Sequence, residues 1–551
     1  MKRTSKVAHA VFSVLMGLTL IVSTVQPGSV LASASPLQGN GIRRSVHPQA
    51  APGVPASIAV YGGSPQSAII KMPFGQSFFA LVLDDSGNPV SGVQVTFTAP
   101  LTGASGSFSD TLTNATTALT DTTGLVMASE FTANDVDGTY EVVASVGGVA
   151  KTANFQATNL LVNCYTIPAP SYQDYDLYFR YLSYFCNNGT IGMHGIGSGD
   201  FNQDGRKDIA VLGSDDYNSS MSMLLIFHQE VDHTLAQPEF YFAGLHLNGS
   251  ADELAVGDVN NDGLDDVVIN QSIEQAIGVF YQQPGGSFSD RVLYSGAESA
   301  DALAIGDINN DGLNDVVFSN WGPSIGVFTQ KGDGTLNSVV VYPADPASGG
   351  YEDIGIGDVN GDGRNDVVRL DGQGYRYFLV YAQKPDGTLD DYIIYNFDSV
   401  SSGWTGGGLG VGDVTGDGRS DIILSVLANW PNSKIIVYPQ GQDGSLQSPV
   451  VYRVSEVPTS IELVDVNLDG KLDVVTAHTG WFCLGIMLQR WNGTLDPELC
   501  YTSLYQSGSR PSILSSGDIN GDGYPDLFFT NYQGFYVYYH KYQVFIPLLV
   551  K

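Results

Sequence analysis

The chain has 551 residues, with 57 Asp or Glu against 24 Lys or Arg, so its formal net charge is −33 at pH 7. Such an acidic chain excludes nucleic acid and anionic membrane surfaces as partners, because it has few cations to neutralise phosphates. A hydrophobic fraction of 43% excludes global disorder. The acidity is mostly aspartate (46 Asp, 11 Glu), and 65 glycines accompany it. Both residue types favour turns over helices, so the composition predicts an all-β protein.

Residues 1–34 have the pattern of a cleaved secretory signal peptide. A basic start (residues 2–6) precedes an apolar run (residues 11–25), and A-S-A at residues 32–34 offers a cleavage site. The apolar run is too short for a comfortable transmembrane helix. We therefore expect a secreted or cell-surface protein with no transmembrane segment in the mature chain.

A linker and a first β domain follow the signal peptide. Residues 35–52 are rich in Ser, Pro, Gly and Ala, which is typical of a linker. In residues 53–160 Thr, Val, Ala and Ser dominate, and apolar positions alternate, as in S-G-V-Q-V-T-F-T-A at 91–99. Short strands with regular turns over this length predict a β-sandwich.

Three segments of this domain carry a resemblance to a known family. They are G-N-P-V-S-G-V-Q-V-T-F (87–97), T-D-T-T-G-L (120–125) and F-T-A-N-D-V-D-G-T-Y-E-V-V-A (131–144). In this order they resemble the bacterial Ig-like domains of the invasin and intimin kind, over residues 54–160. The resemblance implies a rigid spacer without a catalytic site.

From residue 200 onward, a nine-residue pattern, D-x-N-x-D-G-x-x-D, returns seven times. The copies begin at Asp200, Asp258, Asp307, Asp358, Asp413, Asp465 and Asp518. Only the fifth copy departs from the pattern, because Thr415 replaces Asn at position three. The spacing between copies is 49 to 58 residues. A period near 50 is typical of propellers, solenoids and arrays.

The pattern suits calcium coordination. Ca²⁺ takes six to eight oxygens, which carboxylates at positions one, five and nine and an amide at position three supply if the chain curls tightly. Gly at position six permits the turn. Position seven supplies a backbone carbonyl, which explains why its side chain varies. Seven copies in register disfavour the alternative of plain solvated acidic turns. An EF-hand is excluded because that loop needs a Glu at position twelve and a following helix, whereas here position nine is Asp and a strand follows it.

We therefore predict about seven Ca²⁺ ions as cofactors. The predicted ligands occupy positions one, three, five, seven and nine of each copy, and they are Asp200, Asn202, Asp204, Arg206, Asp208, Asp258, Asn260, Asp262, Leu264, Asp266, Asp307, Asn309, Asp311, Leu313, Asp315, Asp358, Asn360, Asp362, Arg364, Asp366, Asp413, Thr415, Asp417, Arg419, Asp421, Asp465, Asn467, Asp469, Lys471, Asp473, Asp518, Asn520, Asp522, Tyr524 and Asp526.

Between the loops, most repeats predict four strands in a constant order. A short strand enters the loop, a second leaves it, and a third ends at a turn such as G-D-G-T-L (332–336), after which a fourth strand ends in Tyr. Seven such repeats predict a seven-bladed β-propeller over residues 161–545, with a tail at 546–551. The last repeat lacks its fourth strand. We expect residues 172–184 to supply it, with residues 542–550 as the alternative.

The repeat resembles the FG-GAP/VCBS repeats of integrin-α-like propellers, over about residues 165–545. The metal loops carry the resemblance, whereas V-G-D or I-G-D replaces the G-A-P part of the FG-GAP signature. The resemblance implies calcium sites on loops at one rim, where they stabilise the blades.

Four cysteines complete the pattern: Cys164, Cys186, Cys483 and Cys500. An even number in an exported chain predicts two disulfides, and three pairings are possible. The sequence-local pairing, 164–186 with 483–500, is favoured, because Cys483 and Cys500 flank the turn at 491–493 and would face each other on a hairpin.

The sequence indicates binding rather than catalysis. It contains neither H-E-x-x-H nor G-x-S-x-G. Aromatic residues follow the second strand in four repeats and are candidates for stacking on sugar rings, with packing between blades as the alternative: Trp321, Trp430, Trp481 and Tyr532. We expect a calcium-binding adhesion or recognition protein for an extracellular glycan or protein ligand. The alternative is a secreted polysaccharide lyase or hydrolase.

Overall fold

The computed structural model is all-β in the part of the chain that it describes. The predicted signal peptide, the linker and the tail lie outside this part. The described residues are 53–161, 164–168, 179–186, 192–214, 221–232, 234–245, 253–271, 273–297, 300–320, 322–346, 353–371, 377–397, 406–480, 483–501, 513–531 and 534–540.

Residues 53–161 form antiparallel and mixed sheets around one apolar core. Strands β9 and β10 alternate buried and exposed residues, as the period of a half-buried strand requires. Phe78, Phe97 and Phe155 are fully buried between the sheets. The sheets, in spatial order, are β1 (Ser57–Gly62), β3 (Phe79–Leu83) and β7 (Leu125–Met127); β2 (Gln66–Ile69), β10 (Ala153–Leu160), β9 (Gly138–Val146), β4 (Gln94–Thr98) and β6 (Ala115–Leu119); and β5 (Gly106–Phe108) with β8 (Phe131–Ala133).

Repeated four-stranded antiparallel sheets, each formed by four consecutive strands, make up most of the rest of the described chain. Sheets 1 to 3 are β13 (Gly192–Gly199), β14 (Asp208–Ser214), β15 (Met221–Phe227) and β16 (Glu239–Leu245); β17 (Leu254–Gly257), β18 (Asp266–Gln271), β19 (Ala276–Phe280) and β20 (Val292–Ser295); and β21 (Ala300–Gly306), β22 (Asp315–Asn320), β23 (Ser324–Phe328) and β24 (Val340–Pro343).

Sheets 4 to 6 repeat the same order. They are β25 (Asp353–Gly357), β26 (Asp366–Leu370), β27 (Tyr377–Tyr381) and β28 (Ile393–Asn396); β29 (Gly406–Gly412), β30 (Asp421–Val426), β31 (Lys434–Tyr438) and β32 (Val450–Arg453); and β33 (Pro458–Val464), β34 (Asp473–His478), β35 (Cys483–Met487) and β36 (Leu499–Tyr501).

Sheet 7 joins strands from both sides of this series. Its order is β37 (Leu514–Gly517), β38 (Asp526–Asn531), β39 (Gly534–His540), β12 (Phe179–Cys186) and β11 (Cys164–Pro168). β12 pairs antiparallel with β39, so a strand that precedes sheet 1 completes the last sheet. The sequence analysis expected this strand at residues 172–184, and it did not expect β11 as a fifth strand.

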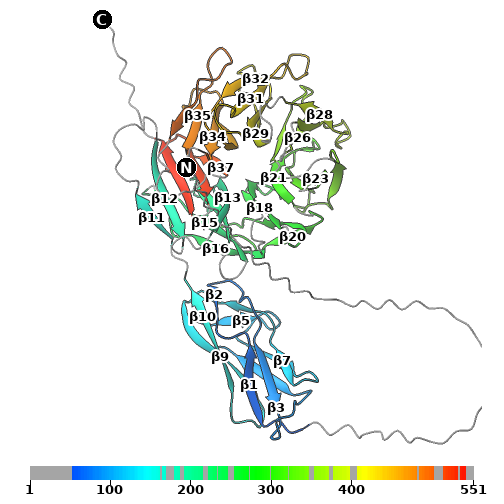
Figure 1. The fold of residues 1–551 in the computed structure, drawn as a ribbon, viewed down its shortest axis with the longest axis vertical. Helices are drawn as coiled ribbons and strands as arrows, with labels where there is room; N and C mark the ends of the chain where they lie inside the picture. The colour runs from blue at the N-terminus through cyan, green and yellow to red at the C-terminus, as the bar shows by residue number, and fades with distance from the viewer. Residues whose placement is uncertain are drawn as a thin grey trace, which may run out of the picture. The chain divides into compact units, whose positions relative to one another are not determined.

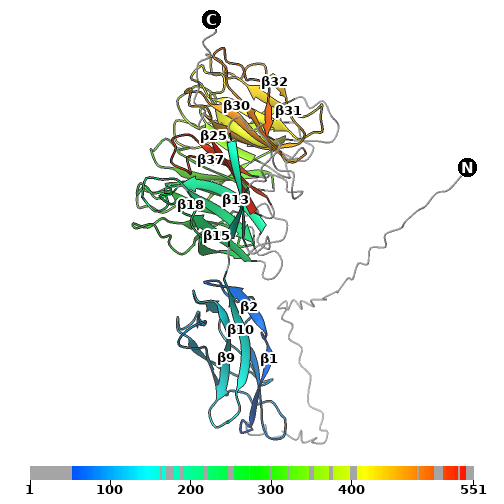
Figure 2. The same ribbon diagram turned by 90° about the vertical axis from the view of Figure 1, so that its left-hand side faces the viewer.

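The first strands of the sheets lie next to one another in chain order, and β37 of sheet 7 contacts β13 of sheet 1. The sheets therefore form a closed, propeller-like ring around these strands (Figure 1). The view at 90° shows β37 beside β13 (Figure 2). At this joint the Phe227 and Phe535 rings pack with centroids 4.9 Å apart, and the Ser198 hydroxyl donates to the Ser516 carbonyl.

The burial of the strands in each repeat reflects how the sheets pack against one another. Second and third strands such as β18 and β19 are buried along their whole length, because neighbouring sheets cover both of their faces. Fourth strands such as β24 and β28 are mostly exposed and lie at the edge of their sheets. The four-strand order that the sequence predicts is thus the order observed.

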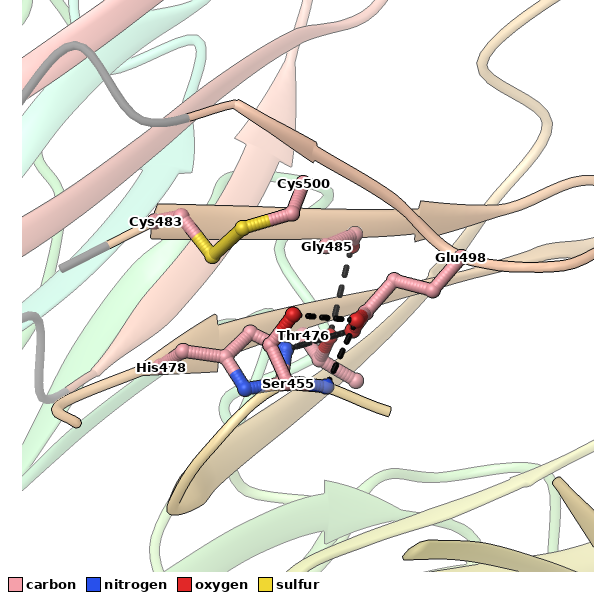
Figure 3. The surroundings of a disulfide bond; sticks show 7 residues. All are labelled: Ser455, Thr476, His478, Cys483, Gly485, Glu498 and Cys500. Carbon is pink, nitrogen blue, oxygen red and sulfur yellow. Dashed lines mark hydrogen bonds and ion pairs between the residues drawn. A yellow bond between two sulfur atoms is a disulfide. The ribbon is translucent and has the colours of Figure 1, made fainter. Parts of the chain in front are cut away.

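The predicted disulfide between Cys483 and Cys500 is present. It joins β35 to β36 with the two Cα atoms 5.7 Å apart (Figure 3). Cys164 and Cys186 are directly paired positions in the register of β11 and β12, which is the backbone placement that the second predicted pairing needs.

A buried arginine of sheet 4 pairs with an aspartate of its own sheet and also binds the neighbouring sheet 3. The Arg369 guanidinium lies 3.4 Å from the Asp371 carboxylate, and both side chains are fully buried. Arg369 also donates to the Ser324 and Gly322 carbonyls at the start of β23. One arginine therefore fixes the connection between β22 and β23 of the neighbouring sheet.

We expect Arg369→Leu to lower the free energy of unfolding by about 3–5 kcal/mol, because it removes a buried cation from beside the Asp371 carboxylate and also removes the donors to the Ser324 and Gly322 carbonyls. Urea unfolding measures the loss. Arg453→Leu, which changes an exposed arginine on β32, is the control and should cost little. Equal losses in the two variants would contradict the role given to the buried pair.

Candidate functional site

The seven D-x-N-x-D-G-x-x-D segments all occupy the same place in the fold. Each connects the first and second strands of its sheet, with positions one to eight between the strands and the ninth residue at the start of the second strand. We name them loops 1 to 7 in chain order. They are residues 200–208, 258–266, 307–315, 358–366, 413–421, 465–473 and 518–526.

The loops share one backbone conformation. The glycine at position six has φ between 82° and 85° in all seven copies, for example 84° at Gly263. A Cβ atom at Gly263 would meet nothing within 4 Å, so the backbone angle and not the available space requires glycine there. Position four also has a positive φ in every loop, including 57° at Leu468. The Asn or Gly at this position in five copies was a signal that the sequence analysis missed.

Loop 2 shows the hydrogen bonds that all loops except loop 5 share, and loop 5 lacks only the one to position three. The Asp258 carboxylate accepts the backbone N–H groups of Asp262 and Gly263 at 3.2 and 2.9 Å. The Asn260 side-chain oxygen accepts the Asp262 N–H at 2.8 Å, and the Asp262 carboxylate accepts the Leu264 N–H at 2.9 Å. The side-chain oxygens at positions one, three and five therefore all turn toward the inside of the loop.

The aspartate at position nine is completely buried in all seven sheets. In sheet 2, one oxygen of Asp266 accepts the Val259 N–H of its own loop at 3.1 Å, and the other accepts the Gln282 N–H at 2.9 Å. Gln282 is the second residue after the end of the third strand, β19. This carboxylate thus ties the loop to the end of the third strand.

Burial raises the pKa of the position-nine carboxyl group in loops 2 to 7. The pKa rises to about 7 for Asp266, Asp315 and Asp473, and to about 8 for Asp526. The aspartates at positions one and five of the same loop raise it further by repulsion between like charges. Three carboxylates therefore interact closely enough in each of these loops to disfavour one another's charge.

Basic side chains at position seven partly offset this charge. Arg206, Arg364 and Arg419 pair with the position-five aspartates of their own loops, and the Lys471 ammonium lies 2.6 Å from the Asp469 carboxylate. The sequence analysis assigned position seven only a backbone carbonyl. In these four loops its side chain also restrains the carboxylate at position five.

The donor set fits a hard cation, because it consists of carboxylates, an amide oxygen and a backbone carbonyl. In loop 5, the Thr415 backbone N–H donates to the Asp421 carboxylate at 3.0 Å, so the residue at position three lies beside the position-nine carboxylate. A carboxylate oxygen that accepts an N–H keeps a lone pair for a ligand bond. Over the same part of the chain, however, no three His, Cys, Asp or Glu side chains are arranged as a group that holds a metal ion. Calcium at these loops therefore stays a prediction.

Of the four predicted sugar-stacking aromatics, only Trp430 lies within the described residues. Its side chain is 58% exposed, in the turn between β30 and β31. Trp321, Trp481 and Tyr532 lie outside that part, so the expected ligand surface stays a prediction.

A polar cluster that the sequence analysis missed lies beside the disulfide of sheet 6 (Figure 3). The buried His478 ring nitrogen Nε2 is 2.6 Å from Oε1 of Glu498, and the Ser455 hydroxyl donates to Oε2 of the same carboxylate at 2.6 Å. Although Ser, His and a carboxylate meet here, the serine bonds to the carboxylate and not to the imidazole. The arrangement is therefore a buried structural network and not a nucleophile–base pair.

Comparison with known families finds FG-GAP repeats in this chain. The FG-GAP-like repeat matches residues 200–269, 258–318, 307–369 and 358–424, and the FG-GAP repeat matches residues 511–546. Each of the first four matches begins at position one of a loop and ends in the second strand of the following sheet. The described part of the chain is thus all-β and propeller-like, and residues 200–424 and 511–546 match FG-GAP repeats. No curated protein matches it.

Similar solved structures include BBS1N in its complex with ARL6DN, soaked with lead, at 9% identity and a TM-score of 0.42, covering 63% of this chain and 92% of that chain. A putative 6-phosphogluconolactonase from Bacteroides uniformis is similar at 12% identity and a TM-score of 0.42, covering 62% and 97%. With TM-scores below 0.5, these two structures support no statement about function.

The buried carboxyl groups predict a pH dependence of stability in EDTA. Their pKa is about 7 when folded and near 3.8 in the unfolded chain, so between these values the folded state holds more protons. Stability should therefore fall as the pH rises from about 4 to about 7. Burial raises the pKa of Asp353 to about 6 and of Glu462 to about 7, which adds to the same trend. Thermal unfolding across this range measures it, and a melting temperature that rises with pH would contradict the assignment.

Proposed function

We propose that this chain is a secreted or cell-surface calcium-binding recognition protein. In this proposal the FG-GAP repeats form a seven-bladed propeller with a Ca²⁺ ion in each of loops 1 to 7, and the propeller binds an extracellular glycan or protein. Residues 53–160 serve as an Ig-like spacer, and residues 1–34 direct export.

The observation that carries the proposal is the buried carboxylate at position nine, repeated in all seven loops beside two further aspartates of the same loop. Without a cation, these neighbouring negative charges repel one another and lower the stability of the folded state. A divalent ion bound by the position-one, position-five and position-nine carboxylates would remove the repulsion that raises the pKa of Asp266, Asp315 and Asp473. The net charge of −33 makes cation uptake favourable for the chain as a whole.

Recognition rather than catalysis is supported by the placement of polar groups. The Ser455, Glu498 and His478 network is buried, and its serine does not contact the imidazole. Trp430, in contrast, is exposed in a turn and presents an apolar ring to solvent.

Within the described residues no helix is long and apolar enough to cross a bilayer.

We expect Ca²⁺ to raise the melting temperature strongly relative to EDTA, because an ion that binds only the folded state stabilises it by about 2.7 kcal/mol per site at a hundred times Kd. Calorimetric titration should count about seven ions, one for each loop. If neither binding nor a shift is observed, the calcium sites are disproved.

Asp262→Asn, at position five of loop 2, should remove or weaken one ion and reduce the calcium-dependent rise in melting temperature. Its control is Asp290→Asn, which changes an exposed aspartate of the same sheet outside the loop. Equal behaviour of the two variants would show that loop 2 does not bind the ion.

Binding to a glycan array in Ca²⁺ and in EDTA tests the ligand class, and Trp430→Ala tests the exposed ring. We expect the chain to bind a glycan in Ca²⁺ but not in EDTA. We expect Trp430→Ala to weaken that binding about tenfold, in line with the loss of one aromatic contact. Release of new reducing ends or unsaturated sugars from a retained polysaccharide would instead favour the lyase or hydrolase alternative.

A further inference from the structure

Loops 1 to 5 share a contact with the sheet that follows each of them. In each case, the backbone carbonyl at position one of the loop accepts an N–H from a side-chain amide of the next sheet. The five bonds are Gln282 to Asp200 at 3.0 Å, Asn314 to Asp258 at 3.0 Å, Asn365 to Asp307 at 2.9 Å, Gln440 to Asp358 at 2.9 Å and Gln489 to Asp413 at 3.3 Å. We call these side chains the joint amides.

The joint amides come from two positions. Gln282, Gln440 and Gln489 stand two residues beyond the end of the third strand, whereas Asn314 and Asn365 occupy position eight of the next loop. Where an asparagine makes the bond, the corresponding glutamine does not. The side-chain nitrogens of Gln330 and Gln383 are buried without a hydrogen-bond partner among the described residues. The chain therefore makes the same bond at five successive joints by two routes, which indicates that the bond matters and not one particular side chain.

The bonded carbonyl belongs to a peptide group that is held at both ends. In loop 4, the Asp358 carbonyl accepts the Gln440 amide, and the N–H of the same peptide, on Val359, donates to the Asp366 carboxylate at 3.1 Å. Because a peptide group is planar, fixing its carbonyl also fixes the direction of its N–H. The joint amide therefore orients the ninth carboxylate of the preceding loop through one rigid unit.

The same glutamine also contacts the loop of its own sheet. The backbone N–H of Gln440 donates to the Asp421 carboxylate of loop 5 at 3.0 Å, while its side chain bonds to loop 4. The side chain of Gln440 is 2% exposed. One buried residue thus connects the ninth carboxylate of loop 5 with the first peptide of loop 4.

A second contact holds the same joint. The turn that follows Gln440 brings Gly444 against loop 4, where a Cβ atom at Gly444 would lie 1.9 Å from the Asn360 carbonyl oxygen. Only glycine allows this approach, and Asn360 is the predicted ligand at position three. A turn of the next sheet therefore packs directly against the backbone of loop 4.

We propose that the joint amides are positioning residues for the cation loops, so that each of loops 1 to 5 reaches its binding geometry only when the following sheet is docked against it. This proposal rests on the proposed calcium sites. It makes cation binding a property of the joint between two sheets and not of one isolated loop, and it couples neighbouring loops through Gln440 and its equivalents.

The test uses the full chain with Gln440→Met, which keeps the volume of the side chain but removes its amide. Gln447→Met is the matched control, because Gln447 is an exposed glutamine in the same turn. The melting temperature of each variant is measured in EDTA and in Ca²⁺, and calcium binding is measured by calorimetry.

We expect Gln440→Met to weaken one calcium site about tenfold, the effect of one hydrogen bond of ordinary strength, and to reduce the calcium-dependent rise in melting temperature. Gln447→Met should match the wild type in both. The triple variant Gln282→Met, Gln440→Met and Gln489→Met should weaken three sites, each about tenfold. A variant that is less stable in EDTA but gains as much from Ca²⁺ as the wild type would limit the amides to a structural role and overturn the proposal.

The two proposals fail in different ways. If the wild-type chain itself shows no calcium binding, the calcium sites and this inference are both overturned. If the wild type binds about seven ions and the triple variant binds them equally well, only the positioning role is overturned. A triple variant that does not fold leaves the single variant, Gln440→Met, to decide.

Discussion

The buried carboxylate at position nine is the interaction on which the ring of sheets depends. In sheets 1 to 6 it accepts one N–H from its own loop and one from the second residue beyond the third strand, as Asp266 does with Val259 and Gln282. In sheet 7 the second donor is His540, at the end of β39. Three strands are thereby joined at one end by a single side chain. Because burial and nearby aspartates raise the pKa of Asp266, the carboxylate that organises sheet 2 is also a disfavoured negative charge. A bound cation would stabilise this negative charge. The carboxylates that hold the sheets together are therefore also the proposed calcium ligands.

Most of the fold follows from the sequence because its signals repeat. Seven copies of one loop, four strands in a constant order and glycine at position six predict elements that the structure contains at the expected places. Ring closure was predicted from a missing strand, and β12 supplies it, although its bounds differ from the expected ones. The disulfide between Cys483 and Cys500 was predicted from the position of a turn between the two residues.

The contacts between sheets did not follow from the sequence. A joint amide can be recognised only when the carbonyl that it contacts is known. The residue also varies, because some joints use a glutamine and others use an asparagine from a different position. The pair of Arg369 and Asp371, and the network of His478 with Glu498, depend on burial that residue type alone does not reveal. Local periodicity thus predicts strands and loops, whereas long-range polar contacts need the packed arrangement of the sheets.

The pairing of β12 with β39 also has a consequence for synthesis of the protein. Phe179 and His540 are paired across 361 residues of sequence. A chain that emerges from the ribosome from its N-terminus must therefore carry β12 with an unpaired edge until nearly all of the ring has been made. Closing such a distant contact is slow, and unpaired strand edges favour association with other chains. For a ring of this kind, the interval between the first and the last strand of sheet 7 is the period of greatest exposure to misassembly.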